Sequence, residues 1–277
     1  MSQPSVLDLF SGIGGFSLGL ERAGFRTAAF CEIDPWCRRV LAKHWPGVPC
    51  YDDVRDLTAA RLRADGVESI DTICGGFPCQ DVSLAGKGDG LDGERSGLWR
   101  SCVRLVGDVR PRRVLVENVG ALRGRGLLAI LGDLASLGYD AEWHAVPAAA
   151  AGAVHLRDRV WILAWRIDMR PCEFCGYVFD HDRLGRYGCP NCCGEAASTD
   201  AAGSGLSQRF GLFRSLSRSL SAVEALGLGP ARPVFLRNVH GVSNRLDRRR
   251  VKALGNAVYP PLVEILGRCV LEQDRAP

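Results

Sequence analysis

Short apolar runs alternate with helical patterns along residues 1–165, and this alternation is the strongest constraint on the fold. The first unit is an apolar run at 6–10, followed by the glycine-rich turn 11–15 and by a helical pattern at 16–23 that Gly24 ends. Strands that alternate with helices form parallel sheets, because each helix carries the chain back to the start of the next strand. The sequence therefore predicts an α/β fold with a doubly wound, mostly parallel sheet.

The same alternation continues after the first unit. Further strands are predicted at 27–31, 69–74, 112–118, 139–146 and 159–165. Helices are predicted at 35–45, 57–64, 96–109 and 121–137, and helical spacing returns at 251–270.

The middle of the chain departs from this pattern. Residues 170–195 are rich in cysteine, and 196–221 are rich in Ser, Gly and Arg with little periodicity. A core domain that is interrupted and then resumed accounts for both the change and the return of helical spacing. We predict a core domain at 1–165, a short insertion at 166–243 and a segment at 244–277 that returns to the core domain.

The composition is that of a globular protein with a sizeable core, because 47% of the residues are hydrophobic and 24% are charged. No run of about 18 apolar residues predicts a membrane span, and the start of the chain lacks the pattern of a secretory signal. We therefore expect a cytoplasmic, reducing location, in which the 12 cysteines serve as ligands or catalysts. The net charge of +4 permits a polyanionic partner without requiring one.

The stretch G-G-F-P-C-Q at 75–80 follows a predicted strand and opens a glycine-rich loop. A lone cysteine is most often a small buried hydrophobe. Here Pro78 stiffens the chain before Cys79 and a polar stretch follows, so we expect the thiol at the exposed carboxyl end of the strand. Ligands bind at that edge of open α/β sheets. Cys79 is therefore predicted to be a nucleophile.

The turn G-x-G-G at 12–15 precedes the first helix, and Glu32 ends the second strand. Glycines let a ligand approach the backbone, the helix N-terminus offers free N–H groups, and the acid can accept hydrogen bonds from ribose hydroxyls. Ser17 occupies the place of the third glycine of the dinucleotide fingerprint. The pattern predicts a nucleoside-bearing cofactor and leaves NAD and S-adenosylmethionine open.

Two further acids each allow two interpretations. Asp53 is followed by the apolar Val54, and such a pair could bracket an adenine ring. Alternatively, Asp53 is a solvated surface acid. Glu117 ends a strand of strong β formers, where it is either a functional carboxylate or a surface acid. A carboxylate buried at that edge would be costly and would point to a chemical role.

Five motifs, in this order and spacing, resemble the cytosine-C5 DNA methyltransferases over nearly the whole chain. They are D-L-F-S-G-I-G-G at 8–15, G-F-P-C-Q at 76–80, E-N-V at 117–119, R-x-R at 157–159 and G-N-A-V at 255–258. The resemblance implies a Rossmann-like (class I) fold that uses S-adenosylmethionine, and an enzyme that methylates C5 of a cytosine flipped out of double-stranded DNA. It also implies a monomer from a restriction–modification system with a cognate endonuclease, or an orphan or phage enzyme.

The resemblance further implies the roles of individual residues. Cys79, as thiolate, would attack C6 of the cytosine, while Glu117 would hold N3 and the exocyclic amine. Arg157 and Arg159 would lie beside the base, where a guanidinium also favours the thiolate. The residues that match cofactor-contacting or cofactor-supporting positions are Asp8, Phe10, Gly12, Gly14, Gly15, Glu32, Ile33, Asp53, Val54, Pro78 and Asn256.

The chain departs from the family pattern in two places. His155 stands two residues before Arg157, where the family usually has glutamine, and we expect retained activity with altered detail. The target-recognition region at 166–243 is short, which leaves the length and identity of the DNA site open.

Two C-x-x-C pairs lie in this insertion and are separated by 13 residues. The pairs are Cys172 with Cys175 and Cys189 with Cys192. Four thiolates complete a tetrahedral site, so the spacing predicts a structural zinc knuckle at 172–193, with His181 and Cys193 as alternative ligands. Zinc would stabilise an insertion that is too short to build its own core.

Two other functions share parts of the pattern. A related branch of the family methylates cytosine C5 in tRNA by similar chemistry. Members of that branch resemble a core domain with little recognition region, whereas this chain has a predicted zinc-bearing recognition region. A DNA-binding regulator built on a methyltransferase fold would not require Cys79, Glu117 and Arg159, all of which are present. The DNA-modifying enzyme is therefore the preferred hypothesis.

Overall fold

The computed structural model describes residues 3–78, 97–153, 155–167, 169–171, 178–180, 253 and 256–275. The strands of its large sheet are β1 (Ser5–Leu9), β2 (Arg26–Cys31), β3 (Cys50–Tyr51), β4 (Thr72–Gly75), β5 (Arg113–Val119), β6 (Tyr139–Pro147) and β7 (Asp158–Arg166). A separate pair consists of β8 (Met169–Pro171) and β9 (Val178–Asp180).

The helices of the described residues cover the large sheet. They are α1 (Gly15–Ala23), α2 (Pro35–His44), α3 (Ala59–Ala64), α4 (Gly97–Val109), α5 (Leu122–Arg125), α6 (Leu127–Ser136), the 3₁₀ turn η4 (Ala148–Ala151) and α11 (Pro260–Arg275).

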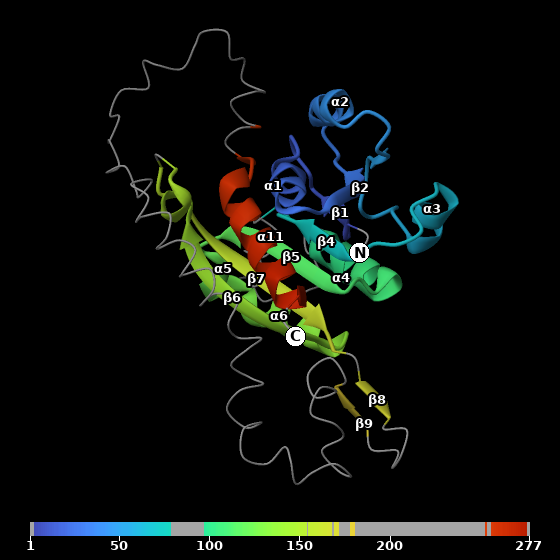
Figure 1. Ribbon diagram of the computed structural model, residues 1–277, viewed down its shortest axis with the longest axis vertical. Helices are drawn as coiled ribbons and strands as arrows, with labels where there is room; N and C mark the ends of the chain where they lie inside the picture. The colour runs from blue at the N-terminus through green and yellow to red at the C-terminus, as the bar shows by residue number, and fades with distance from the viewer. Residues whose placement is uncertain are drawn as a thin grey trace.

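The large sheet has the strand order β3-β2-β1-β4-β5-β7-β6 (Figure 1). Neighbours from β3 to β5 are parallel, whereas β7 runs antiparallel to both β5 and β6. A short connection suits the antiparallel hairpin of β6 and β7, while the parallel strands need longer crossovers. The predicted α/β fold with a mostly parallel sheet is confirmed.

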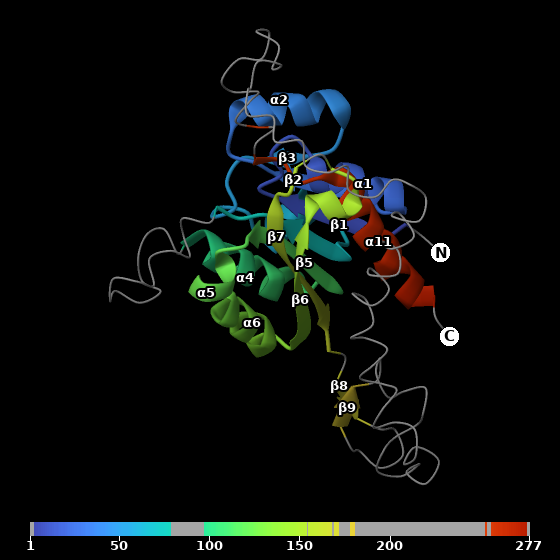
Figure 2. The same cartoon turned by 90° about the vertical axis from the view of Figure 1, so that its left-hand side faces the viewer.

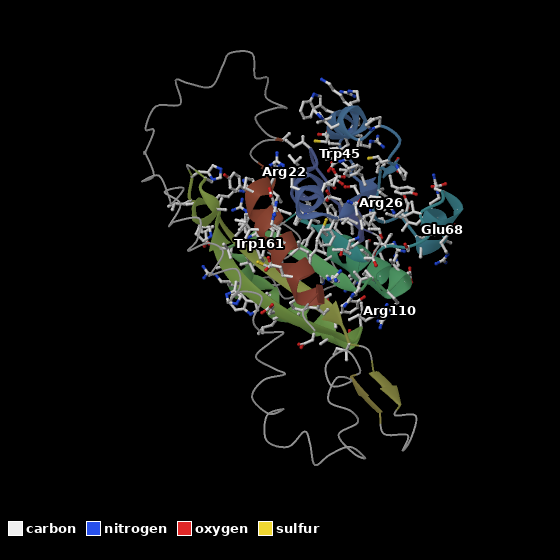
Figure 3. All side chains as sticks on the ribbon, viewed as in Figure 1. Arg22, Arg26, Trp45, Glu68, Arg110 and Trp161 are labelled. Atoms are coloured by element: carbon white, nitrogen blue, oxygen red, sulfur yellow. The ribbon has the colours of Figure 1, made fainter. Side chains whose placement is uncertain are left out.

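The sheet separates two hydrophobic clusters, with α4 and α6 on one face and α1 and α11 on the other (Figure 2). Consecutive residues of β7 face opposite clusters, because side chains alternate along a strand. Ile162 packs in the α4–α6 cluster, and Trp161 packs in the α1–α11 cluster. The Trp161 ring, labelled in Figure 3, meets Phe16 of α1 edge-on, with centroids 5.9 Å apart.

The C-terminal helix α11 lies directly against α1 (Figure 1). A Cβ added at Gly19 of α1 would lie 2.5 Å from Cβ of Val263, so the glycine permits this close approach. Leu262 and Leu266 of α11 are buried in the same cluster as Phe16. The end of the chain therefore completes the face of the sheet that carries the first glycine-rich turn.

Three elements differ from the prediction by more than a shift of their ends. The helix predicted at 121–137 is broken at Gly126 into α5 and α6. The helical spacing at 251–270 is not one helix, because α11 begins only at Pro260, a residue that suits a first turn and lacks the N–H needed further along. Strand β3 was not predicted, because two residues carry no periodic signal.

In the part of the chain that the structure describes, we find no helix with the length and apolar character needed to cross a membrane.

Candidate active site

The carboxyl ends of four parallel strands meet at one edge of the sheet. Leu9, Cys31 and Gly75 share one level in the register, and Val116 lies beside Gly75. The residues that follow them are Phe10, Glu32, Gly76 and Glu117. The strand order reverses between β1 and β4, which is where ligands bind in open α/β sheets.

A tight turn joins β1 to α1 at this edge. Gly12 and Gly14 have φ values of +56° and +86°, in the left-handed region that glycine adopts without strain. The N–H of Gly12 donates to Oε2 of Glu32 at 2.7 Å, and the N–H of Asp34 donates to Oε1 at 2.8 Å. Glu32 thus joins the turn to the start of α2. A Cβ added at Gly12 meets no atom of the described residues within 4 Å, so the turn borders open space.

Asp8 lies beneath this turn and has no exposed surface. Its Oδ2 accepts hydrogen bonds from the backbone N–H of Ser17 at 3.2 Å and from the Ser17 hydroxyl at 2.8 Å. Burial raises the pKa of Asp8 to about 7, while the hydrogen bonds from Ser17 oppose the rise. Asp8 therefore holds the first turn of α1 from within the core, through the serine that replaces the third fingerprint glycine.

Glu117 and Arg159 form an ion pair where β5 and β7 run side by side. Nε of Arg159 lies 2.8 Å from Oε1 of Glu117, and Glu117 is only 7% exposed. The surface-acid interpretation of Glu117 is therefore wrong. Burial raises the pKa of Glu117, and the charges of Arg159 and Arg157 oppose the rise. A buried carboxyl with a raised pKa and a fixed cation can share a proton with a bound ligand.

The segment before α11 contacts both sides of this edge. Nη2 of Arg157 donates to the carbonyl of Asn256 at 3.2 Å. A Cβ added at Gly15, the first residue of α1, would lie 2.8 Å from the carbonyl oxygen of Val258. The C-terminal segment thus contacts both the glycine-rich turn, at Gly15, and Arg157, which lies two residues before Arg159.

His155, the departure from the usual glutamine, also reaches this segment. Its ring meets Tyr259 edge-on, with centroids 5.9 Å apart. Burial and the neighbouring Arg159 lower the pKa of Arg157, which lies two residues after His155.

Cys79 lies outside the described residues, but the chain leading to it is fixed against β5. Nδ2 of Asn118 donates to the carbonyl of Phe77 at 3.1 Å. A Cβ added at Gly76 would lie 3.1 Å from Oε2 of Glu117. These contacts bring the segment that precedes Cys79 alongside the Glu117 carboxylate.

The remaining predicted cofactor residues differ in exposure. Ile33 is 64% exposed, and Pro78 is exposed as well. The Asp53 carboxylate accepts a hydrogen bond from Nε of Arg55 at 2.9 Å, which lowers the pKa of Asp53. Val54 is buried in the α4–α6 cluster, so its side chain does not reach solvent.

The predicted zinc ligands cannot be placed. Cys172, Cys175, Cys189 and Cys192, with the alternatives His181 and Cys193, lie outside the described residues. Within the described ranges, no three His, Cys, Asp or Glu side chains are grouped to hold a metal ion. The antiparallel strands β8 and β9 flank the segment 172–177, which contains the first C-x-x-C pair.

Sequence reasoning missed three supporting residues. Ser17 was treated only as a missing glycine, although its hydroxyl and N–H hold Asp8. Asn118 was quoted in E-N-V without a role, and it fixes the carbonyl of Phe77. Asp34 could have been found, because an Asp directly before Pro35 is a signal for a helix N-cap.

Comparison with known proteins shows the family to which the chain belongs. Residues 5–180 match the model of the C-5 cytosine-specific DNA methylases. The chain belongs to this family. It is 39% identical over 167 residues to the type II methyltransferase M2.BsuMI of Bacillus subtilis, a match that covers 57% of this chain and 41% of that protein. It is 35% identical over 190 residues to the type II methyltransferase M.HgiBI of Herpetosiphon aurantiacus, covering 66% of this chain and 43% of the relative.

The chain therefore spans less than half of the length of these two type II methyltransferases. Among solved structures, it superposes with a TM-score of 0.52 and 30% identity on a prophage-encoded protein of Escherichia coli described as a DNA modification methyltransferase, over 68% of this chain and 56% of that one. It also superposes on the methyltransferase EhMeth of Entamoeba histolytica with a TM-score of 0.61 and 14% identity, over the full length of both chains. The second likeness supports the methyltransferase fold alone.

Proposed function

We propose that this family member is a DNA (cytosine-5)-methyltransferase that transfers a methyl group from S-adenosylmethionine to C5 of a cytosine flipped out of duplex DNA. The observation that carries the proposal is the buried Glu117–Arg159 pair. It lies at the same sheet edge as the glycine-rich turn and beside the segment that leads to Cys79. One edge therefore combines a cofactor-binding backbone, a carboxyl with a raised pKa and the approach to a thiol.

In the proposed reaction, the thiolate of Cys79 attacks C6 of the flipped base. Negative charge builds on the ring, and Glu117 stabilises it by sharing a proton with N3, which its raised pKa favours. Arg159 keeps the Glu117 carboxylate oriented and offers further N–H donors to the base. The adduct makes C5 nucleophilic, so that it would take the methyl group supplied by S-adenosylmethionine, with S-adenosylhomocysteine as the leaving group. Loss of the C5 proton to a base and cleavage of the C6–S bond would then release Cys79.

The residues present fit S-adenosylmethionine, which supplies a methyl group on a sulfonium when bound. The open space at Gly12 lets a ligand approach the turn, and Glu32 is fixed at the end of β2 with lone pairs that can accept from ribose hydroxyls. Exposed Ile33 follows Glu32 and offers an apolar surface to an adenine ring. Asp8 supports the turn through Ser17, and Gly14 and Gly15 allow the close approach of Trp45 and Val258. Asn256 lies two residues before Val258 in the same segment.

We further propose that residues 166–243 recognise the DNA site and contain one structural zinc. The support is the pattern of the four thiolates, Cys172, Cys175, Cys189 and Cys192, of which Cys172 follows β8 directly in the sequence. We expect about one zinc per chain by elemental analysis. A metal-free preparation that is folded and methylates its site normally would contradict the knuckle.

The type II names of the relatives support a role in a restriction–modification system with a cognate endonuclease. We propose that the chain acts as a monomer in the cytoplasm. Sedimentation of the protein with and without a duplex that contains its site tests the oligomeric state.

The experiment that tests the function is incubation with S-adenosylmethionine and a mixed duplex DNA, followed by mapping of 5-methylcytosine at base resolution. Methylation confined to one short motif is expected, and the Cys79→Ala variant should bind S-adenosylmethionine but give no product. Methylation of tRNA in place of DNA would contradict the proposed substrate. Cofactor binding without any methylation would favour a regulator.

A further inference from the structure

Helix α2 lies between Glu32 and Trp45, two residues that contact the glycine-rich turn of the proposed cofactor site. It begins at Pro35, three residues after Glu32, with Asp34 as its N-cap, and it ends at the C-cap Trp45. Asp34 is tied to Glu32 by the hydrogen bond from its own N–H, and Glu32 is tied to the glycine-rich turn through Gly12. The first end of α2 is therefore fixed to one side of the turn.

The other end of α2 returns to the same turn. A Cβ added at Gly14 would lie 2.5 Å from Cη2 and 2.5 Å from Cζ3 of Trp45, and 3.1 Å from a methyl group of Leu41. Figure 3 places Trp45 between α2 and α1. The indole ring thus fills the space directly behind the turn, which leaves room only for a glycine.

Trp45 is itself held in one orientation by polar and aromatic contacts. Its Nε1 donates to both carboxylate oxygens of Glu21 in α1, each at 2.9 Å. The hydroxyl of Thr27 donates to the same carboxylate at 2.5 Å. The ring also meets Phe30 of β2 edge-on, with centroids 5.3 Å apart.

From these contacts we propose that Trp45, oriented by Glu21, is a positioning residue that keeps Gly14 in the left-handed conformation with which the turn 11–15 binds S-adenosylmethionine. Two residues that flank α2 hold the turn. Glu32, which precedes the helix and accepts from the N–H of its N-cap Asp34, fixes Gly12, and the C-cap Trp45 supports Gly14. A turn that is already in its bound conformation loses less entropy when it binds a ligand. The inference rests on the proposed function, because it names the ligand of that turn.

A positioning role differs from general packing in what it changes. Loss of Trp45 should raise the Kd and KM for S-adenosylmethionine and leave kcat at saturating cofactor nearly unchanged, because the residue does not touch the reacting atoms. The expected rise in Kd for Trp45→Leu is about tenfold, which corresponds to about 1.4 kcal/mol. Isothermal titration of the full chain with S-adenosylmethionine measures it.

The matched control is Trp143→Leu, which removes the same side chain from β6, where Trp143 is 38% exposed. We expect an unchanged Kd for this variant. If Trp45→Leu and Trp143→Leu lower the melting temperature and raise the Kd to the same extent, the positioning role is wrong and Trp45 only contributes to packing.

Two further variants keep the inference testable if Trp45→Leu does not fold. Trp45→Phe keeps most of the ring but loses the N–H, and Glu21→Gln keeps one acceptor oxygen for that N–H, so we expect smaller rises in Kd of about threefold for each. In the double variant Glu21→Gln with Trp45→Phe the two changes should not add, because both act on the same hydrogen bond, which Trp45→Phe removes and Glu21→Gln weakens by removing the charge of the acceptor. Full additivity would overturn the coupling of the two residues.

The outcomes for the inference and for the proposed function are separable. Wild-type protein that binds S-adenosylmethionine, with an unchanged Kd in Trp45→Leu, overturns the inference and leaves the proposed function intact. Wild-type protein that does not bind S-adenosylmethionine overturns both.

Discussion

The two sides of the sheet edge are built in different ways. On the cofactor side, the side-chain hydrogen bonds join residues close in the sequence: the N–H of Gly12 donates to Glu32, and the hydroxyl of Ser17 donates to Asp8. On the base side, Glu117 meets Arg159 from the antiparallel strand β7, and Arg157 meets the carbonyl of Asn256, 99 residues further along the chain. The hydrogen bonds of the cofactor side are thus local, although Val258 of the C-terminal segment also packs against Gly15. The base side exists only once β7 and the C-terminal segment have packed.

This comparison predicts that changes on the base side reduce turnover, whereas changes on the cofactor side reduce cofactor binding or stability. The largest effect is expected for Glu117→Gln. The amide cannot share a proton with N3, so kcat should fall about 10³-fold while the Kd for S-adenosylmethionine stays unchanged. Steady-state kinetics together with calorimetric titration measure both quantities.

The control for this variant is Glu142→Gln in β6. Burial, with a smaller contribution from Asp140, raises the pKa of Glu142 to about 8, so the side chain is largely neutral at pH 7 and the amide resembles it. Activity should be retained. Equal losses in Glu117→Gln and Glu142→Gln would mean that any buried carboxyl of the sheet is needed only for folding.

A second variant tests the contribution of Arg159 on the base side. Arg159→Ala leaves a buried Glu117 carboxylate without its ion-pair partner and should lower kcat/KM about 10²-fold. Arg123→Ala removes an exposed pair instead, since Arg123 and Asp158 lie 3.7 Å apart with both side chains 51% exposed. Because exposed ion pairs contribute about 1 kcal/mol at most, this control should change kcat/KM less than threefold.

On the cofactor side, Asp8 makes stability depend on pH. Its pKa of about 7 exceeds the ordinary value of 3.8, so the folded state binds more protons than the unfolded state between these values. The contribution of Asp8 to stability is therefore complete below pH 3.8 and is lost as pH rises to about 7.

The variant Asp8→Asn removes this titration and keeps an acceptor for Ser17. Between pH 5 and pH 7, the free energy of unfolding of the wild type should fall by about 2 kcal/mol relative to the variant, at about 1.4 kcal/mol per pH unit. Urea unfolding at several pH values measures the difference. Parallel pH profiles for the two proteins would show that Asp8 titrates normally.

The smallest effect compares two glycines of one turn. Both Gly12 and Gly14 have a positive φ, so alanine strains the backbone at either position by about 1 kcal/mol. Only at Gly14 would the new Cβ also collide with Trp45. Without cofactor, Gly14→Ala should therefore lower the free energy of unfolding by about 1 kcal/mol more than Gly12→Ala. Equal losses would mean that the indole moves aside freely.

Much of the local structure could be predicted from the sequence. The apolar run at 6–10 and the helical pattern at 16–23 appear as β1 and α1 within one residue, because a buried strand and an amphipathic helix each impose a period on the sequence. Strand β3 could not be predicted, because it forms only through its pairing with β2. The break within the helical pattern of 121–137 falls at Gly126, a residue type that disfavours a helix interior but does not by itself fix a break.

For the candidate site, the sequence by itself determined the residue types and their order, including the positive-φ glycines and the acid at the end of β2. These depend on local backbone chemistry, which a few neighbouring residues decide. Only the tertiary structure decided that Glu117 is buried against Arg159, that Asp8 faces Ser17 and that Trp45 lies behind Gly14. Burial and long-range contact depend on how strands and helices pack together, and no single segment of the sequence contains that information.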